Sequence, residues 1–569
     1  MYDILIKNTK IVDGTGRPAY TGNITIKDSK ILEIGTVKEN AEITIDATGL
    51  LSCPGFICPH NHIDITLPLF PLCSNFVMQG ITTAVGGNCG MSGAPKKSLS
   101  FEKWLSNLEK IGISVNYIPL VGHSTVRELV MGQDFKRLAT PEEIEEMKKY
   151  VEEAMLSGAH GFSTMRDPSA GEYGDINEVI ELAKIASQYG GIYATHHKHI
   201  QSQWSSDDLE EYSYGIFHGP AEDIWVGRYR GLHEAFEIAR KANIPLHISH
   251  ISNIYRIPQP HPDFLDEAVA KATLWNIDKA IEDGLDITFD LIPNTSSISP
   301  STPLISEFLV SRAQALEWLK NLEEEEFIEN LKNKGFRDKI KEISNKGRLK
   351  LGMINTKADP YWMDRFMILK CKNKSLENKS IGEISAFKNR DALDVVFDII
   401  IEDPETEWVQ FDDDRLMEKC VPVLLQHPLC MPCTDNFALP PFDFPKKALK
   451  MFPPEYIKFL YAPIFYGLYA DYIGRHVREN KVLTLEEAIR KATSLPAKRF
   501  RLSDRGILIP NNHADIVIFD YNKIRMSGDF KDPLQVPDGI HFVIINGQIT
   551  FENKEHTGKK AGKVIRHQI

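Results

Sequence analysis

The stretch PEEIEEMKKYVEEAMLSGAHGFSTM, residues 141–165, contains a helical pattern followed by a strand pattern. In its first part apolar residues recur at intervals of three and four and a glycine follows, which predicts an amphipathic helix. The part after that glycine is a short apolar run typical of a buried strand. The same order returns in INEVIELAKIASQYGG and GIYATHH, and repeated units of this kind predict a parallel sheet.

Eight candidate strands of this type lie between residues 55 and 436. They are GFICPHNH, ITTAVGGNC, VNYIPLVGH, AHGFSTM, GIYATHH, IPLHISH, LDITFDLIP and CMPCTDN. Eight is the number that a closed (β/α)8 barrel needs, and several of these segments end in His, Cys or Asp. Because the carboxyl ends of barrel strands carry the chemistry of this fold, we predict an α/β protein built on a TIM barrel.

Short alternating strands occupy both ends of the chain. We predict that residues 1–54 and 481–569, the latter including a C-terminal helix, form a small β-sandwich beside a barrel of residues 55–480. The stretch between LDITFDLIP and CMPCTDN is too long for a loop and contains the helical pattern AFKNRDALDVVFDIIIED. It predicts an inserted subdomain at about residues 294–420, between strands seven and eight.

The composition is that of a soluble globular protein, with 42% hydrophobic and 25% charged residues in a chain of 569. A formal charge of -12 without a basic block argues against nucleic-acid and membrane partners and favours a small molecule. Asp3 and Lys7 interrupt any signal core, and eight scattered cysteines do not form a disulfide framework. We therefore expect a cytoplasmic protein, as a monomer or homo-oligomer, with reduced thiols available for metal.

Two histidines one residue apart, His60 and His62, end the first candidate strand. On an extended segment positions i and i+2 face the same side, so two imidazoles can point at one metal ion. Such a pair alone is as often a surface or core feature as a metal site. Further ligands are needed to decide.

Several segments resemble those of the N-acyl-D-amino-acid deacylase (D-aminoacylase) family of the amidohydrolase superfamily. They are IVDGTGRPAY, PGFICPHNH, ITTAVGGNCG, LHISH, LLQHPLCMPCTDN, LEEAIRKATSLPAKRF, RGILIPNNHADIVIFD and INGQI, in the family's order over nearly the whole chain. The resemblance implies a zinc-dependent hydrolase that cleaves the C–N amide bond of an N-acyl-D-amino acid or related N-acyl compound. Metal-activated water would be the nucleophile.

The resemblance also assigns site residues. Tight binding of one Zn2+ falls to Cys89, His196 and His250, a second, weaker site falls to His60 and His62, and proton transfer falls to Asp435. A Cys-His-His set leaves the fourth position of zinc open for water, as a catalytic site requires. The aspartate would take the proton from the attacking water and deliver it to the leaving amine.

Other residues near these motifs are given plainer interpretations. His196 lies in THHKH, where the adjacent histidines are alternative ligands. We expect packing or hydrogen bonding behind the site for His123 and His247, and a turn at His427. The CMPC motif at Cys430 imitates a redox or zinc motif, but a single pair is interpreted as reduced core cysteines.

The chain departs from the family in the substrate-facing loops. In GFSTMRDPSAGEYG, Arg166 is inserted into the family motif, Lys198 replaces an arginine, and Ser252 replaces a lysine. In the family these basic groups help to hold the substrate carboxylate, and an ammonium cannot reproduce the bidentate contact of a guanidinium. We predict that these three residues bind substrate, with Arg166 as a replacement anion contact, and that ordinary N-acetyl-D-amino acids are poor substrates.

A long aromatic segment, QWSSDDLEEYSYGIFHGPAEDIWVGRYR at residues 203–230, separates strand five from its helix. One hypothesis is a lid or subunit contact that accepts a larger or flatter substrate group. The alternative is a loop that merely packs on the barrel.

Two other function classes stay open. A cyclic-amide hydrolase of the dihydroorotase or hydantoinase type would use the same barrel and metal water on a ring C–N bond. A non-catalytic metal-binding scaffold is the third class, but it would leave the open ligand set and the proton-handling aspartate unexplained.

Overall fold

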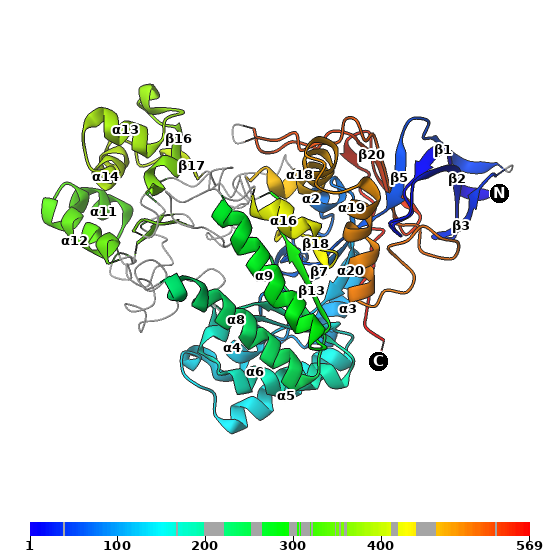
Figure 1. Cartoon of the computed structure of the whole chain (residues 1–569), viewed down its shortest axis with the longest axis horizontal. Coiled ribbons are helices and arrows are strands. Elements are labelled where there is room, and N and C mark those ends of the chain that lie inside the picture. Colours follow the sequence, from blue (N-terminus) through cyan, green and yellow to red (C-terminus); the bar gives the residue numbers. More distant parts are fainter. Residues whose placement is uncertain are drawn as a thin grey trace.

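A ring of parallel strands forms the centre of the computed structural model (Figure 1). Its strands are β6 (Phe56–Cys58), β7 (Ile81–Gly86), β8 (Asn116–Pro119), β9 (Val121–Gly122), β10 (Gly161–Met165), β11 (Ile192–His196), β12 (Leu246–Ile248), β13 (Ile287–Leu291) and β18 (Cys430–Pro432). The structure describes residues 1–37, 40–166, 169–198, 221–251, 264–294, 304–305, 308, 319, 322–346, 349–351, 354–357, 361–410, 419–439, 462–529 and 532–568.

The strand order confirms the predicted fold class. β6, β7 and β8 pair in parallel, and β9, β10, β11, β12, β13 and β18 form a second parallel series. Because only Leu120 separates β8 from β9, these two segments occupy one position, and the ring has the eight positions of a (β/α)8 barrel. Each of the eight predicted segments supplies one position.

Backbone hydrogen bonds just beyond the strands join the last strand to the first. The N–H of Asp435 donates to the carbonyl oxygen of His60 at 3.1 Å, and the N–H of His62 donates to that of Asn436 at 2.7 Å. We call this junction the barrel seam. It places predicted site residues from opposite ends of the barrel sequence directly beside one another.

Helices cover the outside of the barrel. They are α3 (Phe101–Ile111), α4 (His123–Met131), α5 (Pro141–Leu156), α6 (Ile176–Gln188), α8 (Ala221–Ala242), α9 (Phe264–Glu282), α16 (Cys420–Gln426), α18 (Ile464–Asp471), α19 (Leu485–Ala492) and α20 (Ser494–Arg499). The start of α5 is fixed by a capping box, in which Thr140 accepts from the N–H of Glu143 and Glu143 accepts from the N–H of Thr140. Proline at the first position of α5 fits this start, because it needs no hydrogen-bond partner there.

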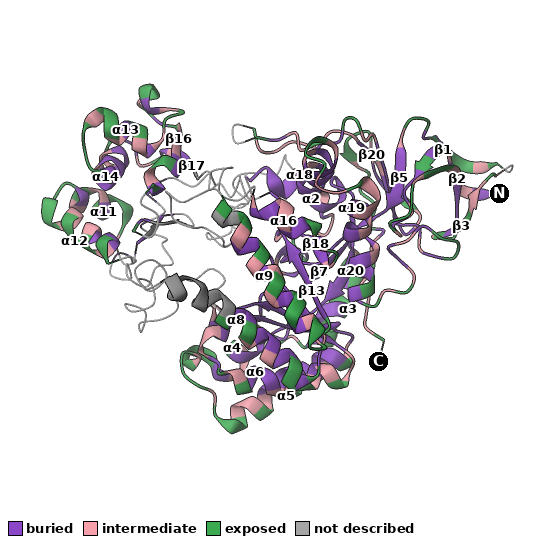
Figure 2. Ribbon diagram, viewed as in Figure 1, coloured by how far each residue is buried: buried purple, intermediate pink, exposed green. Residues whose placement is uncertain are grey.

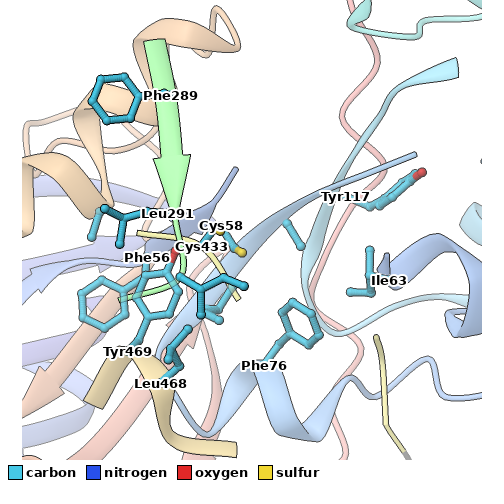
Figure 3. Close-up of a cluster of buried hydrophobic side chains, with 14 of the residues drawn as sticks. Phe56, Cys58, Ile63, Phe76, Tyr117, Phe289, Leu291, Cys433, Leu468 and Tyr469 are labelled. Carbon is cyan, nitrogen blue, oxygen red and sulfur yellow. The ribbon is translucent and has the colours of Figure 1, made fainter. Parts of the chain in front are cut away.

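The faces of the barrel strands and helices that meet are coloured as buried in Figure 2, and the buried residues there form one apolar core. Figure 3 shows part of this core, where Phe56 of β6 stacks on Tyr469 of α18 with ring centroids 5.2 Å apart. The Tyr469 hydroxyl lies 2.9 Å from the carbonyl oxygen of Pro432 and 3.4 Å from that of Ile57. One tyrosine therefore contacts both the first and the last barrel strand beneath the seam.

The two chain ends pair in one nine-stranded sheet. It contains β1 (Tyr2–Ile11), β2 (Tyr20–Lys27), β3 (Lys30–Gly35), β4 (Ala41–Asp46), β5 (Leu51–Pro54), β19 (Ile516–Phe519), β20 (Ile540–Ile545), β21 (Gln548–Glu552) and β22 (Glu555–His556). β5 connects the halves by pairing with β1 and with β19. Strands from the two ends of the chain pair, as predicted, and they form one continuous hydrogen-bonded sheet. Isoleucines from both ends share one core.

A separate unit lies between β13 and β18 and occupies the left of Figure 1. Its elements are α11 (Glu324–Leu331), α12 (Lys334–Asn345), β14 (Lys350–Leu351), β15 (Ile354–Asn355), β16 (Phe366–Lys370), α13 (Ile381–Lys388), α14 (Ala392–Glu402) and β17 (Glu407–Gln410). It has its own apolar core, which includes Phe327, Phe397 and Trp408. The predicted helical pattern at 386–403 contains a break, because Asn389 adopts a left-handed φ of 48° and Asp391 caps α14.

Among the residues that the structure describes, no helix is both long enough and apolar enough to cross a lipid bilayer.

Candidate metal centre

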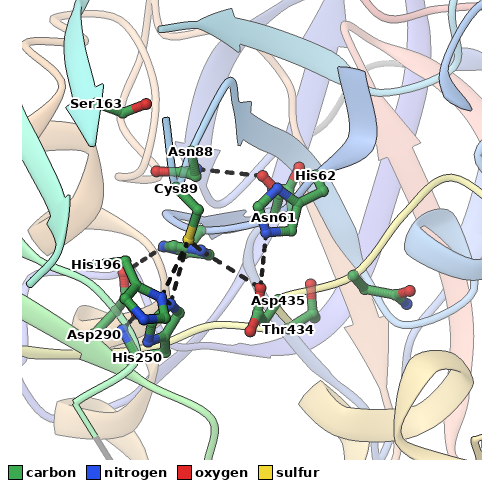
Figure 4. A network of polar contacts seen from close by, with 12 residues as sticks. Asn61, His62, Asn88, Cys89, Ser163, His196, His250, Asp290, Thr434 and Asp435 are labelled. Atoms are coloured by element: carbon green, nitrogen blue, oxygen red, sulfur yellow. Dashed lines mark hydrogen bonds and ion pairs between the residues drawn. The ribbon is translucent and has the colours of Figure 1, made fainter. Parts of the chain in front are cut away.

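Four side chains meet at the carboxyl ends of barrel strands, around the sulfur of Cys89 (Figure 4). The Sγ atom lies 3.3 Å from His60 Nε2, 3.3 Å from His250 Nε2 and 3.8 Å from His196 Nδ1. His196 Nδ1 is also 3.1 Å from His250 Nε2. The structure thus brings together the three residues predicted for the tight site and adds His60 to them.

A second group of donor atoms shares His60. It joins His60, His62 and Asp435, whose ligand atoms all lie within 4.8 Å of one another. Asp435 Oδ1 is 3.2 Å from His62 Nε2 and 3.5 Å from His60 Nε2. The predicted weaker site and the predicted proton carrier are therefore in direct contact.

Burial and nearby charge shift the pKa values of Cys89 and Asp435, the two acidic residues of the cluster, in opposite directions. Burial acts to raise the pKa of the Cys89 thiol, but the charges of His60 and His250 outweigh it, so the pKa lies well below its ordinary value. Burial likewise acts to raise the pKa of Asp435, and hydrogen bonds from His60 and His62 lower it well below its ordinary value. A thiolate and a carboxylate are the forms that bind metal ions.

The backbone of the cluster is unusual. Cys89, His250 and Asp435 have φ values of 49°, 33° and 49°, in the left-handed region that non-glycine residues rarely occupy. Strain of this kind persists only where surrounding contacts hold it, and it is concentrated at functional sites. Three such residues in one cluster mark it as a site.

Ser163 holds the turn that carries Cys89. Its hydroxyl donates to the carbonyl oxygen of Gly87 and accepts from the N–H of Gly90 at 3.0 Å, on either side of the cysteine. At Gly87, with φ of 82°, a Cβ atom would lie 2.1 Å from the carbonyl oxygen of Leu120, so only glycine fits. The glycines of AVGGNCG therefore serve close backbone approach around Cys89, as their sequence context indicates.

Asp290 of β13 is a buried member of the site that the sequence interpretation missed. Its Oδ1 accepts from the N–H of His250 at 2.6 Å, and its Oδ2 lies 2.6 Å from His247 Nε2 and 3.7 Å from His60 Nδ1. The available signal was a charge inside the apolar strand LDITFDLIP, since a buried carboxylate needs partners.

The remaining histidines and cysteines have local partners. His123 is buried against Glu178, with 2.7 Å between Nε2 and Oε1, and His427 Nε2 lies 3.0 Å from Asp278 Oδ1 in the turn before β18. Cys430 and Cys433 are free and buried. These placements agree with the structural roles expected for them.

The predicted substrate contacts are placed less favourably. Arg166 is only 2% exposed, its Nε donates to Glu234 of α8 at 2.7 Å, and one terminal nitrogen donates to two loop carbonyl oxygens. The structure thus gives this guanidinium internal partners, which disagrees with the predicted anion contact. Lys198 is half-buried and lies two residues after the end of β11, whereas Ser252 lies outside the described residues.

The aromatic segment at 203–230 lies mostly outside the described residues. Its last part belongs to α8, which begins at Ala221. That part is therefore helix, where the sequence interpretation placed the whole segment before the helix.

The donor set fits zinc. Ligands at about 2.0–2.3 Å from one tetrahedral ion lie roughly 3.3–3.8 Å from each other. The donor atoms of Cys89, His196 and His250 are 3.1–3.8 Å apart, close to that range. Mixed sulfur and imidazole donors favour zinc over magnesium or calcium.

The fold and the site together define a class of protein. The fold is a (β/α)8 barrel, and its site has a histidine pair after the first strand, metal donors after the middle strands and an aspartate after the last. The protein is a metal-dependent hydrolase of the amidohydrolase type. Comparisons with known proteins agree. A sequence profile described as "Amidohydrolase family" matches residues 463–551.

Individual proteins that are similar to this chain indicate a more specific group within this class of hydrolases. D-aminoacylase of Alcaligenes xylosoxydans xylosoxydans is 26% identical, over 99% of this chain and 97% of its own. N-acyl-D-aspartate deacylase of the same organism is 25% identical, over 99% and 95%. A crystal structure of N-acyl-D-glutamate deacylase from Bordetella bronchiseptica, with zinc and a phosphonate mimic of the tetrahedral intermediate, shares the fold with a TM-score of 0.67 at 23% identity, covering 99% of each chain. Over nearly its full length the chain is thus similar to N-acyl-D-amino-acid deacylases, and its carboxyl-terminal part matches the amidohydrolase profile.

Proposed function

We propose that the protein hydrolyses the carbon–nitrogen amide bond of an N-acyl-D-amino acid or a related N-acyl compound, with zinc as its metal. The observation that supports this most directly is the set of sulfur and imidazole donors 3.1–3.8 Å apart at the barrel mouth. Tight binding of one ion is assigned to Cys89, His196 and His250, and a second, weaker site to His60 and His62. A bound zinc ion supplies a Lewis acid and a water that ionises near neutral pH.

Asp435 is the group proposed to move the proton. Its side chain is 23% exposed, whereas those of His60 and His62 are 0% and 8% exposed, so its carboxylate is the open edge of the cluster. From there Oδ1 can accept a proton from the attacking water and return it to the leaving amine nitrogen. Hydrogen bonds from His60 and His62 keep this carboxylate ionised, which is the form that can accept a proton.

The substrate class follows from relatives and from the cations of the site. The relatives act on N-acyl compounds of D-amino acids, as their names state. Because Arg166 is bonded to Glu234, Lys198 is the better candidate for the contact with the substrate carboxylate. A single ammonium gives weaker geometric selection than a guanidinium, which supports tolerance of acyl compounds other than simple N-acetyl-D-amino acids.

The test is hydrolysis of N-acyl-D-amino acids, their L-enantiomers and cyclic ureides by zinc-loaded protein. Asp435→Asn is measured beside it, with Asp403→Asn as a matched control, since Asp403 is a buried aspartate of the inserted unit. We expect turnover of D-acyl compounds that falls about 10²–10⁴-fold in Asp435→Asn and is unchanged in the control.

Each alternative outcome has a definite meaning. Turnover of cyclic ureides alone would transfer the protein to the cyclic-amide hydrolases. Bound zinc without hydrolysis of any amide would support the scaffold class. Equal activity in Asp435→Asn and the parent protein would remove that residue from the proton-transfer role.

A further inference from the structure

The carboxylate of Asp290 lies behind the metal centre and contacts it at two points. It is 0% exposed and projects from β13, between β12, which precedes His250, and β18, which precedes Asp435. In Figure 4 it stands beside His250 on the side away from Asp435. It is too deeply buried to touch a substrate, so any role must act through its neighbours.

The first contact fixes the backbone of a proposed ligand. Asp290 Oδ1 accepts from the N–H of His250 at 2.6 Å. His250 is the residue with the left-handed φ of 33°, and a conformation of that kind persists only when a neighbouring group holds it. The carboxylate, which accepts this charge-assisted hydrogen bond, is such a group, and the bond directs the His250 ring toward Cys89.

The second contact concerns the ring of His60. Asp290 Oδ2 lies 3.7 Å from His60 Nδ1, which forms no hydrogen bond among the described residues, while His60 Nε2 faces Cys89. A carboxylate beside Nδ1 favours the tautomer with its proton on Nδ1, and that tautomer leaves Nε2 free to bind metal.

His247 also contacts Asp290 but does not neutralise its charge, so that charge can act on the His60 ring. His247 lies 2.6 Å from Asp290 Oδ2 through Nε2 and 2.8 Å from the Thr288 hydroxyl through Nδ1. Burial lowers the pKa of His247 below its ordinary value, so the ring is neutral at pH 7. A neutral ring orients the carboxylate by donating one hydrogen bond but does not cancel its charge.

We propose that Asp290 is a positioning residue of the metal centre, which sets the backbone of His250 and the ring tautomer of His60 with one carboxylate. The inference rests on the metal centre proposed above. Carboxylates that hydrogen-bond to metal-binding histidines typically account for a 10–100-fold difference in metal affinity. We therefore expect the residue to govern zinc affinity more strongly than it governs folding.

The experiment measures the zinc dissociation constant of the full chain by competition with a chromophoric chelator. Asp290→Asn keeps the size of the side chain but removes its charge. Asp515→Asn is the matched control, because Asp515 is also buried and accepts from a backbone N–H, that of Asn546 at 2.7 Å, between the barrel and the terminal sheet. The absorption spectrum of the cobalt-substituted protein gives a second readout, since it reports ligand geometry independently of activity.

We expect Asp290→Asn to weaken zinc binding about 10–100-fold and to change the cobalt spectrum, with neither effect in Asp515→Asn. Unchanged affinity and spectrum in Asp290→Asn would overturn the proposal. If that variant does not fold, Asp290→Glu, which keeps the charge but displaces it, must bind zinc more weakly than the parent, and equal binding would again overturn it. A parent protein that binds no zinc would instead refute the metal centre itself.

Discussion

Glu178 provides the sharpest test of the energetics behind the site. Its carboxylate is 1% exposed, lies 2.7 Å from His123 Nε2 and forms an ion pair with Arg127 Nη1. Burial acts to raise the pKa of Glu178, but the hydrogen bonds and charges of His123 and Arg127 outweigh it and lower the pKa to about 2. We predict that Glu178→Gln destabilises this part of the barrel at neutral pH and has much less effect in acid.

The magnitude follows from that pKa. With 4.5 as the unfolded value and about 2 in the folded chain, ionisation of Glu178 contributes about 3 kcal/mol of stability. Because the folded pKa is the lower one, this contribution is complete above pH 4.5 and is lost as the pH falls toward 2. The variant lacks the ionisable group, so the difference between the two proteins must shrink over the same interval.

Amide hydrogen exchange of α4 and α6 peptides, corrected for intrinsic rates, measures the difference locally. The variant should exchange about 100-fold faster at pH 6 and only about tenfold faster at pH 3. Glu143→Gln is the control, since the pKa of Glu143 is also lowered to about 2, by its hydrogen bonds with Arg137 and the backbone of Thr140. Its partner Arg137 is 42% exposed, so solvent screening limits the effect to under about 1 kcal/mol. Similar ratios for the two variants, or a Glu178→Gln ratio that stays constant below pH 4, would refute the reasoning.

Two further predictions concern the turn that carries Cys89. Gly87→Ala should lower the thermal midpoint far more than Gly49→Ala, although both glycines have φ of 82°, because only Gly87 also lacks room for a Cβ atom. We expect Gly87→Ala to lower the free energy of unfolding by more than about 3 kcal/mol and Gly49→Ala to lower it by about 1 kcal/mol. Equal shifts would show that the close approach is unimportant. Ser163→Ala should weaken zinc binding about tenfold in chelator competition. Thr164→Ala should not, because the Thr164 hydroxyl contacts Tyr193 and Thr195 of β11. Loss in both variants would indicate general damage to β10.

The barrel, and the meeting of its strand-end residues, could be predicted because local pattern and chemistry agree at the strand ends, whereas the roles of those residues came from the family resemblance. Each apolar run is short, is bounded by helical periodicity, and several runs end in a residue that would be costly to bury without a function, such as Cys89, His250 or Asp435. In a parallel barrel such ends meet at one face, so the sequence alone places them near one another. The strand pattern and the chemistry of the end residues are independent requirements, and both point to the same face of the barrel.

Contacts that depend on partners distant in sequence could not be predicted. Asp290 was interpreted as part of a strand because its partners, His247 and His250, belong to another strand. Arg166 was assigned to substrate because Glu234, which binds it, lies on a helix 68 positions away. The break at Asn389 was missed because apolar residues lie on both sides of the polar run KNRD, while the left-handed turn depends on one residue.

The barrel seam has a consequence for how the centre is assembled. His60 and Asp435 are joined by a backbone hydrogen bond although they are 375 positions apart, so the donor cluster cannot exist until the first and last strands have met. Contacts of such long range form late and slowly during folding. A metal ion held by the proposed centre would bind the closed barrel better than the open chain and would thus stabilise the closed form by mass action. Tyr469 is buried and does not contact the proposed ligands. A substitution there would nevertheless raise the zinc concentration needed to keep the barrel closed.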